Sequence, residues 1–136
     1  MSNSERRGRS AVVVRNEGRV ALIKRVRAGH TYFLFPGGGI ELGELPAEAA
    51  EREAREELGL SVVLGPRLLI EEYRGETQHY FSASAIGGEF GSGKAEELRT
   101  SGMTDDGTYE PVWVDVRDLL HYDVRPRALA AILAGG

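Results

Sequence analysis

The stretch that decides the fold runs from Gly38 to Leu60 and reads GGIELGELPAEAAEREAREELGL. It predicts a helix from Pro46 to Leu58, because proline suits the first helical turn and Gly59 is placed to end the helix. At about 100° per residue, three carboxylates share an arc of about 100°, and a stripe of small or apolar residues lies beside them. The carboxylates belong to Glu53, Glu56 and Glu57, and the stripe consists of Ala47, Ala50, Ala54 and Leu58. We therefore expect this helix to pack on a sheet, with an acidic edge beside the contact.

The remaining charges of the helix are arranged differently. Glu48 precedes Arg52 by four residues and Glu51 precedes Arg55 by four, so each pair is expected to form an ion pair on the outer face. The three clustered carboxylates have no such compensation, and at about 6 Å and an effective dielectric near 20 each pair repels by roughly 3 kcal/mol. A hard divalent cation such as Mg²⁺ would remove this repulsion. The alternative is a solvated, Glu-rich helix face.

Short strands and tight turns are predicted before this helix. Ser10–Arg15 and Arg19–Val26 are rich in β-branched residues and are separated by Asn16, Glu17 and Gly18, which predicts a hairpin. Tyr32–Phe35 predicts a third strand, ended by Pro36 and by Gly37–Gly39, where a sharp turn is expected. A glycine loop of this kind also lets backbone atoms approach a ligand closely.

The second half of the chain continues the alternation of strands and helices. Strands are predicted at Ser61–Arg74, Thr77–Ile86 and Glu110–Val116, with a glycine-rich loop over Gly87–Gly107. A turn or short helical segment is expected at Arg117–Val124 and a closing helix at Pro126–Leu133. The simplest packing is one mixed α/β domain over residues 10–136, preceded by a flexible polar tail over residues 1–9.

Composition excludes several classes of protein. The 17 Lys and Arg against 21 Asp and Glu give a net charge of −4, which argues against binding a DNA or RNA polymer, because such binding needs a basic excess. The chain has no cysteine, so disulfides and thiolate metal sites are excluded. The longest apolar run, Ala128–Ala134, is too short to span a membrane and lies at the wrong end for a signal peptide. We expect a cytoplasmic protein that acts away from membranes.

Taken together, the residues from Gly38 to Leu60 resemble the Nudix box of hydrolases that act on nucleoside diphosphates linked to another group. Every charged and glycine position of that pattern is present, namely Gly38, Glu44, Arg52, Glu53, Glu56, Glu57 and Gly59. Ala54 departs from the family's usual larger aliphatic residue, and Leu45 stands where Ser or Thr often caps the helix. The resemblance implies a Nudix-type α/β/α sandwich around a mixed β-sheet.

The resemblance also implies roles for individual residues. Glu53, Glu56 and Glu57 are expected to bind Mg²⁺, for which Mn²⁺ could substitute, and Glu53, Glu56 and Arg52 are expected to serve catalysis. Arg52 would orient a carboxylate, although a plain helix salt bridge with Glu48 is an equal alternative. Glu44 would join the loop to the helix by hydrogen bonds, and Gly59 would end the helix. A distal metal ligand is expected at Glu96, with Glu97 as the competing choice and a solvated acidic loop as the alternative to both.

The substrate site is less sharply defined by the sequence. Arg25, Gly37 and Gly38 are expected to bind the phosphates of the substrate, although charges at the end of a strand are usually solvated. Phe35 and Tyr80 could stack on a base, but aromatic residues in strands more often belong to the core.

The resemblance implies Mg²⁺-dependent cleavage of the pyrophosphate linkage of a small nucleotide, giving a nucleoside monophosphate. Residues 74–78 lack the Pro and Tyr that mark relatives specific for ADP-ribose and for dinucleoside polyphosphates, which leaves a MutT-like enzyme. The alternative is a non-catalytic nucleotide sensor on the same fold. A homodimer is compatible with either.

Overall fold

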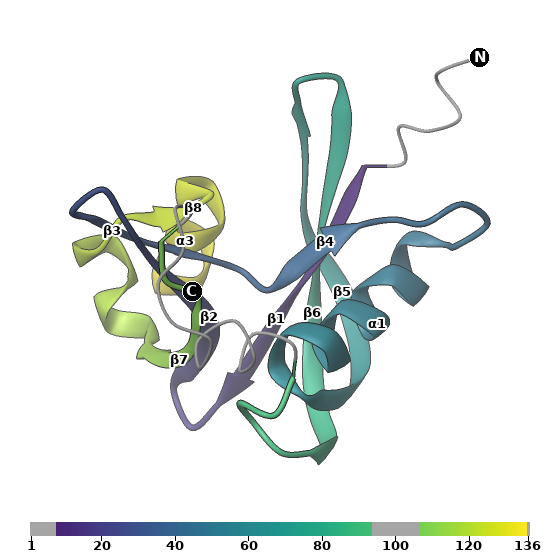
Figure 1. Cartoon of the computed structure of the whole chain (residues 1–136), viewed down its shortest axis with the longest axis horizontal. Helices are drawn as coiled ribbons and strands as arrows, with labels where there is room; N and C mark the ends of the chain where they lie inside the picture. The colour runs from purple at the N-terminus through teal and green to yellow at the C-terminus, as the bar shows by residue number, and fades with distance from the viewer. Residues whose placement is uncertain (1–7, 94–106, 136) are drawn as a thin grey trace.

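The computed structural model describes residues 8–93 and 107–135. Within them the chain forms strands, the helix α1, further strands, the 3₁₀ helix η2 and the helix α3 (Figure 1). In chain order the elements are β1 (Arg9–Asn16), β2 (Arg19–Arg27), β3 (His30–Leu34), β4 (Gly37–Gly39), α1 (Pro46–Leu58), β5 (Leu60–Tyr73), β6 (Glu76–Gly88), β7 (Glu110–Asp115), η2 (Val116–His121), β8 (Val124–Arg125) and α3 (Arg127–Gly135).

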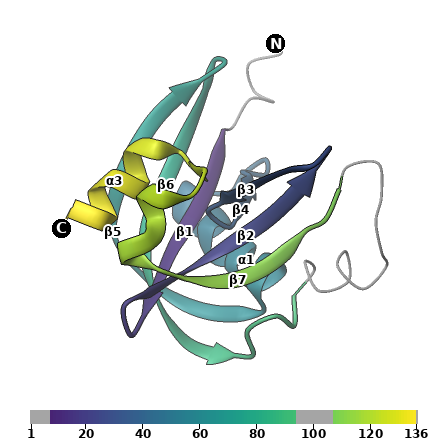
Figure 2. The same ribbon diagram turned by 90° about the vertical axis from the view of Figure 1, so that its left-hand side faces the viewer.

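The strands form one mixed sheet in the order β5-β6-β1-β2-β3-β8, with β4 paired to β1 and β7 paired to β2. Strand β1 belongs to both halves of the sheet. Most of its length pairs with β6 in parallel, and its end pairs with β2 in antiparallel fashion, beginning at Arg15 and Val20. Figure 2 shows β7 following β2 on the second half of the sheet.

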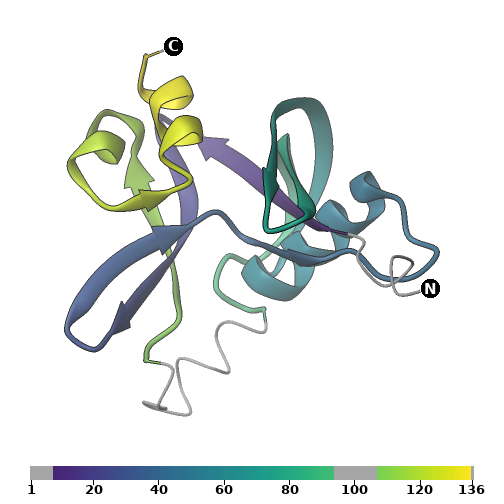
Figure 3. The ribbon, with the colours of Figure 1, turned by 90° about the horizontal axis from the view of Figure 1, so that it is seen from above.

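The side chains of alternate residues of β1 pack into two hydrophobic cores, one on each face of the sheet. Val12 and Val14 pack with Ala50, Ala54 and Leu58 of α1, all fully buried, whereas the intervening residues of β1 pack toward α3 and η2. The two helices accordingly lie on opposite sides of β1 (Figures 1 and 3). The predicted α/β class, with helices on both faces of a mixed sheet, is confirmed.

Helix α1 has the predicted bounds and is fixed at both ends. Leu45 offers no side-chain cap, but its amide donates to the Glu48 carboxylate at 2.9 Å. Gly59 ends the helix with a φ of 80°, where a β-carbon would also lie 2.6 Å from the Glu89 carbonyl oxygen. The expected apolar stripe is wrong at one position, since Ala47 is exposed and Ala49 is buried.

Three local expectations are corrected by the structure. Gly37–Gly39 is a strand and not a sharp turn, because the absence of side chains lets it lie against β1, where a β-carbon on Gly37 would be 2.4 Å from the Ser10 carbonyl oxygen. Strand β1 begins at Arg9, so the last residue of the expected tail is part of the sheet. The expected loop at residues 87–107 starts later, because β6 continues through Gly88. Among the described residues, no helix is long and apolar enough to span a membrane.

Candidate active site

Helix α1 presents Glu53, Glu56 and Glu57, which we call the acidic edge. Glu53 and Glu57 are each only 7% exposed, while the Glu56 side chain is half-buried. Charged carboxylates of this kind are rarely buried without partners, because desolvation penalises the ionised form. The hydrogen-bond partners of these carboxylates therefore determine how the acidic edge is stabilised.

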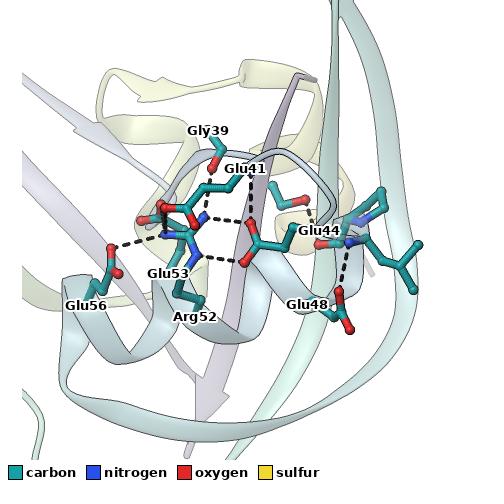
Figure 4. A network of polar contacts seen from close by, with 10 residues as sticks. Gly39, Glu41, Glu44, Glu48, Arg52, Glu53 and Glu56 are labelled. Carbon is teal, nitrogen blue, oxygen red and sulfur yellow. Dashed lines mark hydrogen bonds and ion pairs between the residues drawn. The ribbon is translucent and has the colours of Figure 1, made fainter. Parts of the chain in front are cut away.

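Arg52 connects the acidic edge to the preceding loop (Figure 4). Its guanidinium binds the Glu44 carboxylate through two nitrogens at 2.8 and 2.9 Å, and Nη1 donates to Glu53 at 3.0 Å and Glu56 at 3.2 Å. A further hydrogen bond of 2.8 Å reaches the Gly39 carbonyl. These contacts, led by the bond to Glu44, raise the pKa of Arg52, so the guanidinium stays charged.

This arrangement corrects two expectations. Arg52 turns toward the acidic edge, whereas Glu48, its expected partner on the outer face, binds the Leu45 amide. The acidic edge was also expected to lack local compensation, but Arg52 supplies a cation to two of its three members. Glu48 was the wrong partner because Glu44, eight residues before Arg52, offers both carboxylate oxygens to the guanidinium, a bidentate contact that is stronger than an exposed helix pair.

Glu44 and Gly38 shape the loop side of the acidic edge. Besides binding Arg52, which lowers the pKa of Glu44, the Glu44 carboxylate accepts from the Glu41 amide at 2.9 Å. It therefore links the loop to α1. Gly38 lies directly against Glu53, since a β-carbon on Gly38 would be 2.3 Å from Oε2 of that carboxylate. Burial raises the pKa of Glu53, and the hydrogen bond from Arg52 opposes this shift.

Glu57 is bound from the other half of the sheet. The Tyr109 hydroxyl donates to its Oε1, and the Arg25 guanidinium carbon lies 4.9 Å from the centre of the Tyr109 ring. Burial and the charge of Glu57 raise the pKa of Tyr109, so the hydroxyl remains a donor. Sequence reasoning assigned no role to Tyr109, because nothing local marks a contact between residues 52 positions apart.

The carboxylate oxygens of the acidic edge are the kind of ligand that a hard divalent cation binds. Three carboxylates gather on adjacent turns of one helix, and carboxylate oxygens are the ligands that Mg²⁺ and Mn²⁺ prefer. Within residues 8–93 and 107–135, however, no three acidic or histidine side chains are already close enough to enclose an ion. Arg52 and Tyr109 engage carboxylate oxygens of the acidic edge instead. Glu96 and Glu97, the expected distal ligands, lie outside the described residues.

A cavity of about 780 Å³ opens on the face of the sheet that carries α3. Its floor includes Arg9, Gln78 and Tyr80, which the strand registers place side by side, with Arg9 opposite Gln78 and Tyr80 opposite Ala11. The remaining lining residues come from the end of β3 and the residue after it, from β5, β6 and the turn between them, and from the β8–α3 junction, and they are Leu34, Phe35, Glu71, Tyr73, Arg74, Glu76, His79, Arg125 and Pro126. This volume and mixture of aromatic and polar groups are typical of small-molecule sites.

Arg9 and strand β4 separate the cavity from the acidic edge. Arg9 pairs with Gly39 on one side and Gln78 on the other, and it lines the cavity. Burial raises the pKa values of Glu53 and Tyr80, and the positive charge of Arg9 acts against both shifts. Sequence reasoning missed Arg9 because it assigned that residue to the tail.

The expected phosphate-binding residues are not all brought together. Gly38 touches Glu53, and Gly37 lies against Ala11 of the cavity wall. Both glycines belong to β4, the strand between the cavity and the acidic edge. Arg25 instead donates to the Thr108 carbonyl at 2.8 Å, beside Tyr109, and does not line the cavity.

The model of the NUDIX domain matches residues 4–133 of the chain. The chain belongs to the Nudix family. This Nudix chain is similar in structure to a Nudix-family hydrolase from Clostridium perfringens, with 21% identity and a TM-score of 0.69 over 96% of this chain and 97% of that chain. It is also similar to a MutT structure from a study of Aliivibrio salmonicida and Vibrio cholerae, with 20% identity and a TM-score of 0.73 over 97% of this chain and 98% of that chain. These similarities confirm the Nudix fold that the sequence predicted.

Relatives by sequence include proteins named RNA pyrophosphohydrolase. The one from Bartonella bacilliformis is 34% identical over 60% of this chain, and the one from Acinetobacter baylyi is 45% identical over 36%. The matches cover 62% and 28% of those proteins, less than two thirds of either. The predicted class, a pyrophosphohydrolase, agrees with these names, and the reaction of this Nudix chain is proposed below.

Proposed function

We propose that this Nudix chain is a Mg²⁺-dependent pyrophosphohydrolase that cleaves the pyrophosphate linkage of a small nucleotide and releases a nucleoside monophosphate. The observation on which the proposal rests is the placement of the acidic edge and the cavity on either side of β4, with Arg9 between them. A nucleotide whose base occupied the cavity would extend its phosphates past Arg9 toward Glu53.

Glu53, Glu56 and Glu57 would hold the divalent ion, with Mg²⁺ the expected metal and Mn²⁺ a substitute. The ion would supply neutralisation of the diphosphate and a lowered pKa for bound water. The chain itself supplies the support, because Arg52 fixes Glu53 and Glu56 relative to Glu44. Binding the ion would require Glu53 and Glu56 to give up part of their contact with Arg52, whose charged guanidinium would keep its two hydrogen bonds to Glu44.

The cavity provides groups suited to a nucleoside. The Phe35 and Tyr80 rings meet edge to face with centroids 6.3 Å apart, so a base inserted beside them would contact aromatic surface. Gln78 is 8% exposed and carries both a donor and an acceptor, which suits the edge of a base. Arg9, Arg74 and Arg125 line the cavity, and their guanidinium groups suit contacts with phosphate, although Arg125 is also paired with Asp123 at 2.9 Å.

A screen by ³¹P NMR tests the proposal. Nucleoside triphosphates, oxidised guanine nucleotides, ADP-ribose, nucleotide sugars and dinucleoside polyphosphates would each be incubated with the protein and Mg²⁺, and the spectra report which phosphorus is attacked. We expect a nucleoside monophosphate from at least one of them. Tight nucleotide binding without turnover of any would contradict the proposal and support the non-catalytic sensor.

The names of the relatives favour a second candidate substrate, an RNA that carries a terminal pyrophosphate linkage. The chemistry at the acidic edge would be the same. The net charge of −4 favours the small nucleotide, because a polymer would have to be held against overall repulsion. Comparing kcat/KM for a nucleoside triphosphate and for a short 5′-triphosphorylated RNA separates them, and a higher value for the RNA would overturn the prediction that no RNA polymer is bound.

A further inference from the structure

The contact between Tyr109 and Glu57 joins two parts of the molecule that no local structure connects. Glu57 lies in the last turn of α1, whereas Tyr109 immediately precedes β7 on the other half of the sheet. The hydrogen bond runs from the phenol to Oε1 of a carboxylate that is 93% removed from solvent. The orientation of this buried carboxylate is thereby tied to a residue outside α1.

Tyr109 is itself held firmly against β2. The amide of Thr108 donates to the Val26 carbonyl at 3.0 Å, and the Val26 amide donates to the Thr108 hydroxyl at 3.0 Å. Arg25 adds a hydrogen bond of 2.8 Å to the Thr108 carbonyl while its guanidinium lies over the Tyr109 ring at 4.9 Å. The position of the phenol is therefore set by β2 and not by α1.

We propose that Tyr109 is a positioning residue that orients the Glu57 carboxylate for divalent metal, and that Arg25 acts through Tyr109 by fixing its ring. This rests on the proposed function, in which Glu57 is a metal ligand. Hydrogen bonds to a ligating carboxylate fix its orientation, and their loss typically weakens metal affinity by 10–100-fold. Arg25, expected from the sequence to bind phosphate, would thus serve the metal site instead.

The test measures Mn²⁺ binding without substrate, by electron paramagnetic resonance of the free ion. For Tyr109→Phe we expect a Kd about 10-fold or more above that of the unsubstituted protein. The melting temperature in EDTA should change by no more than a few degrees, and kcat should recover at high Mg²⁺. The matched control is Tyr122→Phe, a half-exposed tyrosine packed on Phe33, which should leave the Mn²⁺ Kd unchanged.

Arg25→Gln extends the test to the second residue. It should weaken Mn²⁺ binding in the unsubstituted background. It should have little further effect in Tyr109→Phe, because Arg25 acts on Glu57 only through the Tyr109 hydroxyl, which that variant already lacks. A loss of stability in EDTA with an unchanged Mn²⁺ Kd would overturn the proposal, as would tighter Mn²⁺ binding by Tyr109→Phe. Glu57→Gln separates the two levels: if it too leaves the Kd unchanged, the metal role of Glu57 fails, whereas if it alone weakens binding, only the role of Tyr109 fails.

Discussion

Replacement of Gly38 by alanine should disable the active site while leaving the sheet intact. A β-carbon at this position would lie 2.3 Å from Oε2 of Glu53, whereas ordinary contact begins at 3.4 Å, so the carboxylate must move by about 1 Å. Glu53 has little room to do so, because it is buried and hydrogen-bonded to Arg52 at 3.0 Å. A displacement of about 1 Å at a catalytic group can cost on the order of 100-fold in rate.

The neighbouring glycine provides a matched control. A β-carbon on Gly39 would meet nothing within 4 Å, and that glycine belongs to the same strand. We therefore expect Gly38→Ala to lower kcat/KM about 100-fold and Gly39→Ala to lower it less than about 3-fold, at saturating Mg²⁺. Overpacking should destabilise Gly38→Ala by about 1–3 kcal/mol, measured by denaturant unfolding. Equal activity of the two variants would refute the reasoning.

Three other predictions concern Arg52, Glu53 and Gln78. Arg52→Ala leaves the buried Glu53 without its cation and should lower the free energy of unfolding by about 3 kcal/mol, measured in urea, whereas an effect below about 1 kcal/mol would show that the pair adds little. The pKa of Glu53 is raised by burial, so its contribution to stability is present below its unfolded pKa and is lost as the pH rises through its folded pKa. In EDTA, Glu53→Gln should therefore gain stability relative to the unsubstituted protein as the pH rises above the ordinary glutamate pKa of 4.5, and a loss over that range would contradict the assigned shift. Gln78→Ala should raise KM for the nucleotide about 10-fold with a smaller change in kcat, and an unchanged KM would place the base elsewhere.

The elements that the sequence predicted well are those defined by neighbouring residues. Helix α1 was predicted with its observed bounds because Pro46, Gly59 and the helical period agree. The hairpin of β1 and β2 followed from Gly18 and two β-branched runs. The spacing from Gly38 to Leu60 identified the family, which the domain match confirms.

What sequence reasoning missed depends on contacts between distant residues. Three glycines in a row favour a turn locally, and only the approach of β1 makes Gly37–Gly39 a strand. Arg52 binds the loop residue Glu44 and not the expected helix partner Glu48. The positions of Arg9 and Gln78 in the cavity require the parallel register of β1 and β6, which no local pattern encodes.

The central claim is that the acidic edge of α1 binds a divalent ion that cleavage requires. It is tested most directly by titrating Mg²⁺ into the substrate-loaded protein and into Glu57→Gln while measuring release of the nucleoside monophosphate. The account predicts saturable release that EDTA abolishes and that Glu57→Gln reduces by at least about 100-fold. Release that is independent of Mg²⁺, or that is equal in Glu57→Gln, would contradict it.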